Sequence, residues 1–245
     1  MCEKFEIKLQ NSFILKLKYL NLKNSTYICN AINKINLLSI PKNKTREIIV
    51  PEFDEFISMD INGMEVFYFI KNYTKMLDNV EITNSFDIYN YIKNDLSLEE
   101  SRSLIKNTLI KLLYGSTSFD MEEVLIKQLI LENYPELDVK ERIGSDMPDY
   151  IQTKFKRIIH INNNYNKLLN NFNQSESNDL MINNITLLWY NIRKFKLRSK
   201  IKMLIHDQII IDCVEDEVDT IKSLLNKIIT NLPFEITTSK TFNLK

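Results

Sequence analysis

Two aspartates at the ends of short apolar strands are the residues of this sequence most suited to holding a metal ion. Asp60 follows the mostly apolar run 56–59, and Asp207 lies in the turn between the β-rich segments 201–205 and 208–213. Two such strands around a two-residue turn predict a tight hairpin. Carboxylates on adjacent strands hold hard cations such as Mg²⁺ through oxygen, and paired Mg²⁺ ions suit in-line phosphoryl or nucleotidyl transfer. If the strands that carry them are neighbours, Asp60 and Asp207 can share a magnesium site.

Asp207 taken alone has a simpler explanation, because short turns favour Asp for its local backbone hydrogen bonds. The two explanations differ in what they require of Asp60. A metal site needs both carboxylates within reach of one ion, whereas a turn residue needs no distant partner.

A helix that ends near Gly115 presents two cations on one flank. Ser97 and Glu100 form a capping-box pattern that predicts its start, and Gly115 stands where a left-handed residue commonly ends a helix. Arg102 and Lys106 are four residues apart, so both lie on one ridge and can meet the phosphates of a nucleotide. Two solvated helix cations are the alternative.

The other elements predicted from the pattern are a mixture of helices and strands in one compact module. They are strand pairing within 5–22, a helix from Asn62, helices over 122–131, 165–172 and 179–195, and a final helix with Val218, Ile221, Leu225 and Ile228 on one face.

The composition is that of a folded protein with no net charge. With 44% hydrophobic residues the chain can bury a core, and 32 basic against 32 acidic residues mean that nucleic-acid affinity must come from local patches. Three scattered cysteines without a CxxC spacing predict reduced thiols. No membrane span or signal peptide is evident, so we expect no membrane partner and an intracellular, cytoplasmic location, or the host cell if the source is viral.

One basic run, 193–200, could contact phosphates, with Phe195 and Leu197 packed inward. An ordinary solvated face accounts for it equally well.

The order and spacing of these residues resemble the family A DNA polymerases, which include the bacterial repair polymerase. The first motif of that family is a strand, an Asp, four residues and a Glu, matched by Asp60 and Glu65. The third motif is a hairpin with His-Asp-Glu at its turn, matched by His206 and Asp207, with Gln208 in place of the last carboxylate.

The second motif places Arg, Lys, an aromatic residue and Tyr-Gly at four-residue steps along a helix. Arg102, Lys106 and Tyr114–Gly115 match it, while Ile110 replaces the aromatic residue. Two further segments are similar to the family: 153–157, with Lys156 where Gly is usual, matches Thr-x-x-Gly-Arg, and Asn170 with Gln174 matches Asn-x-x-x-Gln.

The resemblance implies an α+β fold with a palm, an antiparallel sheet with flanking helices, and helical fingers. We expect the palm in 1–75 and 160–245 and the fingers in 76–159, with the thumb largely absent.

It also implies template-directed addition of deoxynucleotides to a primer 3′ end by two-metal nucleotidyl transfer in DNA replication. The ligands would be primer-template DNA, deoxynucleoside triphosphates and two Mg²⁺ ions, with Mn²⁺ as a substitute, and a partner protein would supply the thumb or processivity function. The residue roles implied are metal binding and catalysis by Asp60 and Asp207, nucleotide binding by Arg102, Lys106, Ile110, Tyr114 and the steric gate Glu65, and DNA binding by Arg157, Asn170, Gln174 and His206.

Two other interpretations remain open at this point. Ile110, Lys156 and Gln208 favour a polymerase-derived protein that has lost activity and binds DNA or serves as a scaffold in a replication complex. An unrelated helical interaction protein would make the matches coincidental and would place Asp60 and Asp207 far apart.

Overall fold

The computed structural model of the chain describes residues 6–8, 14–16, 50–138, 150–160, 165–205 and 207–241. These form two compact units, one made of 62–179 and the other of the chain up to Ile61 together with the chain from Leu180 onward. The boundaries of these two units differ from those expected for the palm and the fingers. The assignment of palm and fingers therefore stays a prediction. In the described part of the chain, no helix is both long and apolar enough to cross a membrane.

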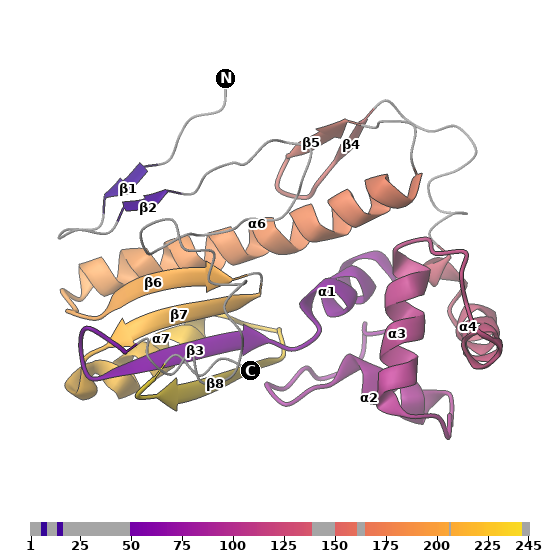
Figure 1. Cartoon of the computed structure of the whole chain (residues 1–245), viewed down its shortest axis with the longest axis horizontal. Coiled ribbons are helices and arrows are strands. Elements are labelled where there is room, and N and C mark those ends of the chain that lie inside the picture. The colour runs from indigo at the N-terminus through magenta and orange to yellow at the C-terminus, as the bar shows by residue number, and fades with distance from the viewer. Residues whose placement is uncertain are drawn as a thin grey trace. The chain divides into compact units, whose positions relative to one another are not determined.

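The first unit is built on a four-stranded antiparallel sheet in the order β6-β7-β3-β8 (Figure 1). The hairpin predicted around Asp207 is confirmed as β6 and β7, and the apolar run before Asp60 is confirmed as β3. Its elements are β3 (Glu55–Ile61), β6 (Lys200–Ile205), β7 (Gln208–Cys213), a 3₁₀ helix (Glu215–Glu217), α7 (Val218–Ile228) and β8 (Phe234–Ser239); β1 (Glu6–Lys8) and β2 (Ile14–Lys16) form a separate antiparallel pair.

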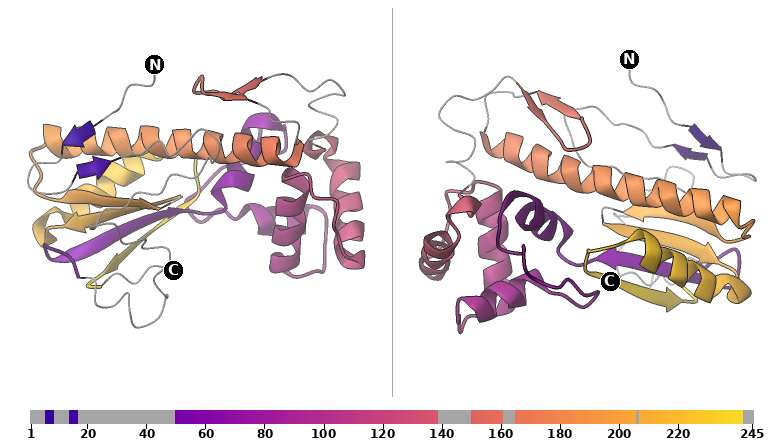
Figure 2. Two further views of the ribbon diagram at one scale, coloured as in Figure 1. Left: turned by 45° about the horizontal axis from the view of Figure 1, so that its top comes forward. Right: turned by 180° about the vertical axis from the view of Figure 1, so that it is seen from behind.

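Successive side chains along each strand point to opposite faces of the sheet, and one of these faces is apolar and covered by helices. Ile57 and Met59 on β3 lie opposite Ile211 and Ile209 on β7, and all four side chains are fully buried. Residues directly opposite in an antiparallel pair share a face, so these four point to one side of the sheet. Figure 2 shows α7 and the part of α6 from Leu180 onward over one face of the sheet.

The second unit is mainly helical, with α3 packed against α1, α2 and α4 (Figure 1). Gly63 precedes α1 with a φ of 58°, in the left-handed region that suits glycine. A Cβ there would lie 3.1 Å from the Tyr89 ring, so the glycine also allows α1 and α2 to approach closely. The elements are α1 (Met64–Tyr73), α2 (Ile88–Asp95), α3 (Arg102–Leu113), α4 (Met121–Asn133), a 3₁₀ helix (Pro135–Leu137), β4 (Tyr150–Gln152) and β5 (Ile158–His160).

A single long helix, α6 (Tyr165–Lys194), continues from this unit into the other, where the sequence pattern predicted two helices. The expected gap falls at 173–178, a run of polar residues of which Asn173, Ser175 and Glu176 are among those buried. Glu176 accepts hydrogen bonds from the Tyr68 hydroxyl at 3.1 Å and the Tyr73 hydroxyl at 2.9 Å. Tertiary partners therefore satisfy polar side chains that resemble a loop when read in sequence.

The predicted capping box at Ser97 and Glu100 is wrong. The cap of α3 is Ser101, whose hydroxyl accepts from the Leu104 amide at 3.3 Å. Ser97 instead has a φ of 50°, and the Leu98 amide donates to the Lys93 carbonyl at 2.9 Å. This geometry ends α2, so Ser97 belongs to the C-terminus of that helix and not to the start of α3.

Cys213, at the end of β7, is expected to be unreactive while the protein is folded. Burial is the main cause that raises the pKa of its thiol to about 11; the Ser199 hydroxyl opposes the shift, and Glu217 adds to it. The thiolate is the reactive form, and an unfolded thiol ionises near pH ~8.5. In a Cys2→Ser/Cys29→Ser background, we expect slow labelling by a thiol reagent at pH ~8 and fast labelling in urea.

The same shift makes stability depend on pH. The pKa of the Cys213 thiol is higher in the folded than in the unfolded protein, so burial of the protonated thiol stabilises the fold. This stabilisation is fully present below the ordinary thiol pKa and is lost as the pH rises towards about 11. Fast labelling of the folded protein near neutral pH would contradict the burial of this thiol.

Candidate active site

Asp60 and Asp207 lie side by side in the backbone of the first unit. Asp60 is opposite Gln208 in the β3–β7 pairing, and the Ile61 amide donates to the Asp207 carbonyl at 3.2 Å. The two strands are therefore neighbours, as a shared metal site requires. This pairing contradicts the interpretation as an unrelated protein, which needed the two aspartates far apart.

The side chain of Gln208 is part of the same polar edge. Its Nε2 donates to the Ser58 hydroxyl at 2.7 Å, across from β7 to β3. Ser58 and Asp60 are two residues apart on β3, so both point to the face opposite the apolar one. Gln208, which the resemblance places where the family has a carboxylate, is thus held against the strand that carries Asp60.

Glu235 is a further acidic residue at this edge of the sheet. It lies directly opposite Asp60 in the β3–β8 pairing and so shares its face of the sheet. No motif or spacing indicated it, because only the pairing of strands about 175 residues apart in sequence brings it there.

Within the residues that the structure describes, no three or more His, Cys, Asp and Glu side chains form a group that could hold a metal ion. Mg²⁺ is commonly bound by one or two carboxylates together with substrate phosphates, rather than by a cage made of protein alone. Asp60 and Asp207 on paired strands fit that mode of binding.

In the second unit, Glu65 and Tyr114 are brought together from α1 and the end of α3. The Tyr114 hydroxyl donates to Glu65 Oε2. Burial, together with the Glu65 carboxylate, raises the pKa of the Tyr114 hydroxyl above its ordinary value, so the group remains a donor at all working pH values. Two residues that were assigned to nucleotide binding separately therefore act as one hydrogen-bonded pair.

Arg102 and Lys106 share one exposed flank of α3, as their spacing predicted. Arg102 lies 4.9 Å and Lys106 5.8 Å from the centroid of the Tyr89 ring. Arg102 Nε also donates to Asp87 Oδ2 at 2.6 Å. The other oxygen of Asp87 caps α2 by accepting from the Tyr89 amide at 2.9 Å. A phosphate that binds Arg102 must therefore compete with Asp87.

Ile110, one turn further along α3, is half-buried. Its aliphatic side chain stands in the row where the family has an aromatic residue.

Arg157 lies in the turn between β4 and β5, where it is bound to α6. Its Nε donates to Asp179 Oδ2 at 3.1 Å, and its Nη2 forms a second bond to Oδ1. Lys156, at the position where the family has Gly, adopts the left-handed conformation with a φ of 68°. A bidentate pair with an arginine that is 15% exposed holds the turn on the helix.

The other predicted DNA-binding residues are Asn170 and Gln174, both half-buried on α6, and His206, which lies outside the described residues. Asp60 and Asp207 belong to the first unit, whereas the described nucleotide- and DNA-binding candidates belong to the second.

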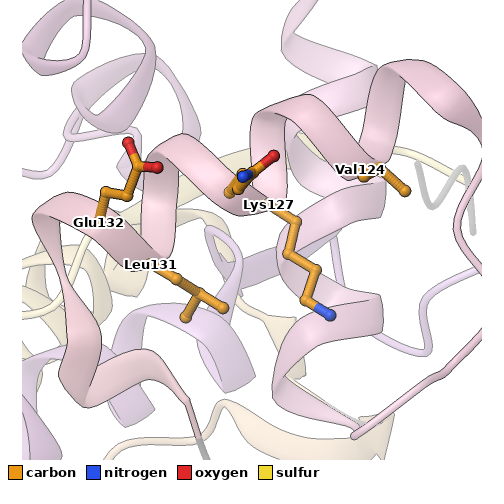
Figure 3. A pocket seen from close by; sticks show the side chains of 5 residues that line it. Val124, Lys127, Leu131 and Glu132 are labelled. Atoms are coloured by element: carbon orange, nitrogen blue, oxygen red, sulfur yellow. The ribbon is translucent and has the colours of Figure 1, made fainter.

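A hollow of about 340 Å³ opens on the second unit along α4 (Figure 3). Its lining includes Val124, Lys127, Gln128, Leu131 and Glu132. None of these is a candidate catalytic or nucleotide-binding residue.

No protein-family model and no curated protein matches the amino-acid sequence. The structure, however, is similar to the POL domain of Pol1 from M. smegmatis in a complex with DNA primer-template and dNTP, with a TM-score of 0.73 and 15% sequence identity. The match covers 94% of this chain and 47% of that one, so the chain spans about half the length of its relative.

The fold resembles that of a family A polymerase domain. This confirms the expected α+β class, with its four-stranded antiparallel sheet and packed helices. Of the three positions that depart from the family pattern, Ile110 lies on α3 and Gln208 on β7, whereas Lys156 lies in the turn between β4 and β5.

Proposed function

We propose that the protein is a template-directed DNA polymerase module that adds deoxynucleotides to the 3′ end of a primer. The observation that carries the proposal is the pairing of β3 with β7, which brings Asp60 beside Asp207 in a polymerase fold. In the proposed reaction the primer 3′ hydroxyl loses its proton and attacks the α-phosphate of the nucleotide, and pyrophosphate leaves.

In this proposal residues 1–75 and 160–245 supply the palm and residues 76–159 the fingers. Asp60 and Asp207 would hold two Mg²⁺ ions, with Mn²⁺ as a substitute, and these ions would stabilise the charge that develops on the attacking and leaving oxygens. The protein's own task at this edge is to hold two carboxylates at a fixed spacing on paired strands.

Residues other than Asp60 and Asp207 would bind the nucleotide and the DNA. Arg102 and Lys106 would contact the triphosphate, with Arg102 exchanging Asp87 for a phosphate oxygen. Tyr114 would stand beside the template base and Glu65 against the ribose, while Arg157, Asn170, Gln174 and His206 would position primer or template.

Discrimination between deoxyribonucleotides and ribonucleotides is expected to depend on the Glu65–Tyr114 pair. In Glu65→Ala, the side chain that would meet a 2′-hydroxyl is gone, and we expect the preference in kcat/KM for deoxyribonucleotides to fall by roughly tenfold or more. Steady-state incorporation of a matched deoxyribonucleotide and ribonucleotide opposite one template base measures the ratio.

Tyr114→Phe is the matched variant, because it keeps the ring and removes only the hydroxyl that donates to Glu65. It should lower the preference less than Glu65→Ala does. An unchanged preference in both variants would remove Glu65 from the proposed gate.

The proposal as a whole is tested by primer extension on a primed template with Mg²⁺ or Mn²⁺ at low salt, using the wild type beside Asp60 and Asp207 variants. Extension by the wild type that is lost in both variants supports it.

A second function is favoured by two observations. Gln208 stands where the family has a carboxylate, and Arg102 is paired with Asp87. Both would suit a polymerase-derived subunit that binds primer-template DNA without extending it. A well-folded wild type that binds DNA but does not extend it would establish this alternative.

A further inference from the structure

The end of α6 forms an exposed basic and aromatic surface in the first unit, which we call the α6 end patch. It consists of Leu187, Tyr190, Lys194, Phe195 and Lys196. Tyr190 is 57% exposed, Phe195 53% and Leu187 43%, so the expectation that Phe195 packs inward is wrong.

The way in which α6 ends accounts for this exposure. Lys196 has a φ of 55°, its amide donates to the Arg193 carbonyl at 3.1 Å, and the Leu197 amide donates to the Ile192 carbonyl at 2.9 Å. These two bonds and the left-handed residue make a Schellman turn. In that motif the residue after the turn packs back on the helix, and here Leu197 is half-buried. The turn therefore holds Phe195 and Lys196 outward in an ordered conformation.

Contacts with acidic residues divide the cations of the basic run into two groups. Arg198 Nη2 donates to both oxygens of Asp216 at 2.7 Å, and Lys200 Nζ lies 3.4 Å from Glu52. Among the described residues, no carboxylate lies within ion-pair distance of Lys194 or Lys196. The stretch 180–200 itself contains no Asp or Glu.

Aromatic rings lie beside cations at this end of α6. Lys194 Nζ lies 5.8 Å from the centroid of the Phe195 ring, and the Arg193 guanidinium lies 4.5 Å from that of Trp189. Exposed rings stack on unpaired bases, and neighbouring cations attract the phosphates that join them. A duplex offers no free base faces to such rings, so the chemistry of the patch favours a single strand.

We propose that the α6 end patch binds single-stranded nucleic acid, at a site distinct from the Asp60–Asp207 edge. Tyr190 and Phe195 stack on bases, and Lys194 and Lys196 contact phosphates. The chain carries equal numbers of basic and acidic residues, so attraction for a polyanion at this place is local.

Trp189, the only tryptophan of the chain, makes binding at the patch directly observable. It precedes Tyr190 on α6, so a strand bound there should quench its fluorescence. We expect a short oligothymidylate to quench Trp189 saturably at low salt. Lys194→Gln/Lys196→Gln should bind more weakly and reduce the slope of log affinity against log salt by about 1.4, or ~0.7 for each phosphate contact. Tyr190→Ala/Phe195→Ala should weaken binding by about tenfold or more.

Arg198→Gln/Lys200→Gln is the matched control, because it removes two cations of the same run that already contact carboxylates. It should bind as the wild type does, as should Asp60→Asn/Asp207→Asn, which tests independence from the proposed polymerase site. Circular dichroism and urea unfolding should show that each variant is folded.

Three results would overturn the proposal. These are wild-type binding by the Lys194/Lys196 variant, an equal loss in the Arg198/Lys200 control, or equal competition by a duplex of the same length.

Discussion

Asp60→Asn and Asp207→Asn are each expected to lower the rate of primer extension by about a thousandfold or more. Each change keeps the size of the side chain and removes one negative charge from the paired edge of β3 and β7. Metal ions held there would contribute several kcal/mol of transition-state stabilisation, and each ~1.4 kcal/mol is tenfold in rate. Single-turnover extension of a labelled primer at saturating enzyme measures the chemical step separately from DNA binding.

Two further variants make the result specific. Asp219→Asn removes a carboxylate from the exposed first turn of α7 in the same unit and should leave extension unchanged. Gln208→Glu restores the carboxylate that the family resemblance implies, while the Ser58 hydroxyl can donate in place of the lost amide. It should keep or raise the rate. Full activity in Asp60→Asn would contradict a mechanism that needs both carboxylates.

Asp212→Ala is expected to destabilise the sheet unit by about 3–5 kcal/mol, the largest effect on stability that the structure indicates. Asp212 is fully buried on β7, and its two oxygens accept from the Glu52 and Phe53 amides at 3.0 Å each. Lys202 Nζ lies 3.3 Å from the same carboxylate. Alanine leaves the two backbone donors without this acceptor, and buried donors are costly to leave unpaired. It also removes one of the two carboxylates at the largely buried Lys202 ammonium, which keeps its contact with Glu52 at 2.7 Å.

Asp216→Ala is the matched control for this change. Asp216 also binds a cation, Arg198, with two bonds of 2.7 Å, but both side chains are more than half exposed. We expect a cost of at most ~1 kcal/mol, because water competes for exposed ion pairs. Urea unfolding followed by circular dichroism compares the two variants. Equal effects would mean that burial does not set the strength of these pairs.

The local pattern of apolar and polar residues was sufficient to predict most of the secondary structure. The apolar run before Asp60, the hairpin around Asp207 and the helix from Val218 were all predicted, since each depends on residues close together in sequence. The prediction of a break in α6 failed because that part of the helix depends on distant partners. The buried polar run at 173–178 continues α6 because tyrosines of α1 bind Glu176.

The candidate site was likewise predictable in part from the sequence and decided in part by the fold. Spacing along the chain was enough to select Asp60, Asp207, Arg102 and Lys106, because family motifs keep fixed intervals within one strand or helix. It could not show that Glu235 lies opposite Asp60, since cross-strand neighbours are set by sheet register.

Charge pairing likewise depended on the fold. Arg102 and Arg198 each contact an aspartate, whereas in the described structure no carboxylate lies within ion-pair distance of Lys194 or Lys196. The sequence does not show which of these four cations meets a carboxylate. Amino-acid type and spacing decided which side chains could do chemistry and on which elements they stand. Which of them meet a counter-charge was decided by tertiary contacts, because electrostatic interaction depends on distance and burial in space rather than on separation along the chain.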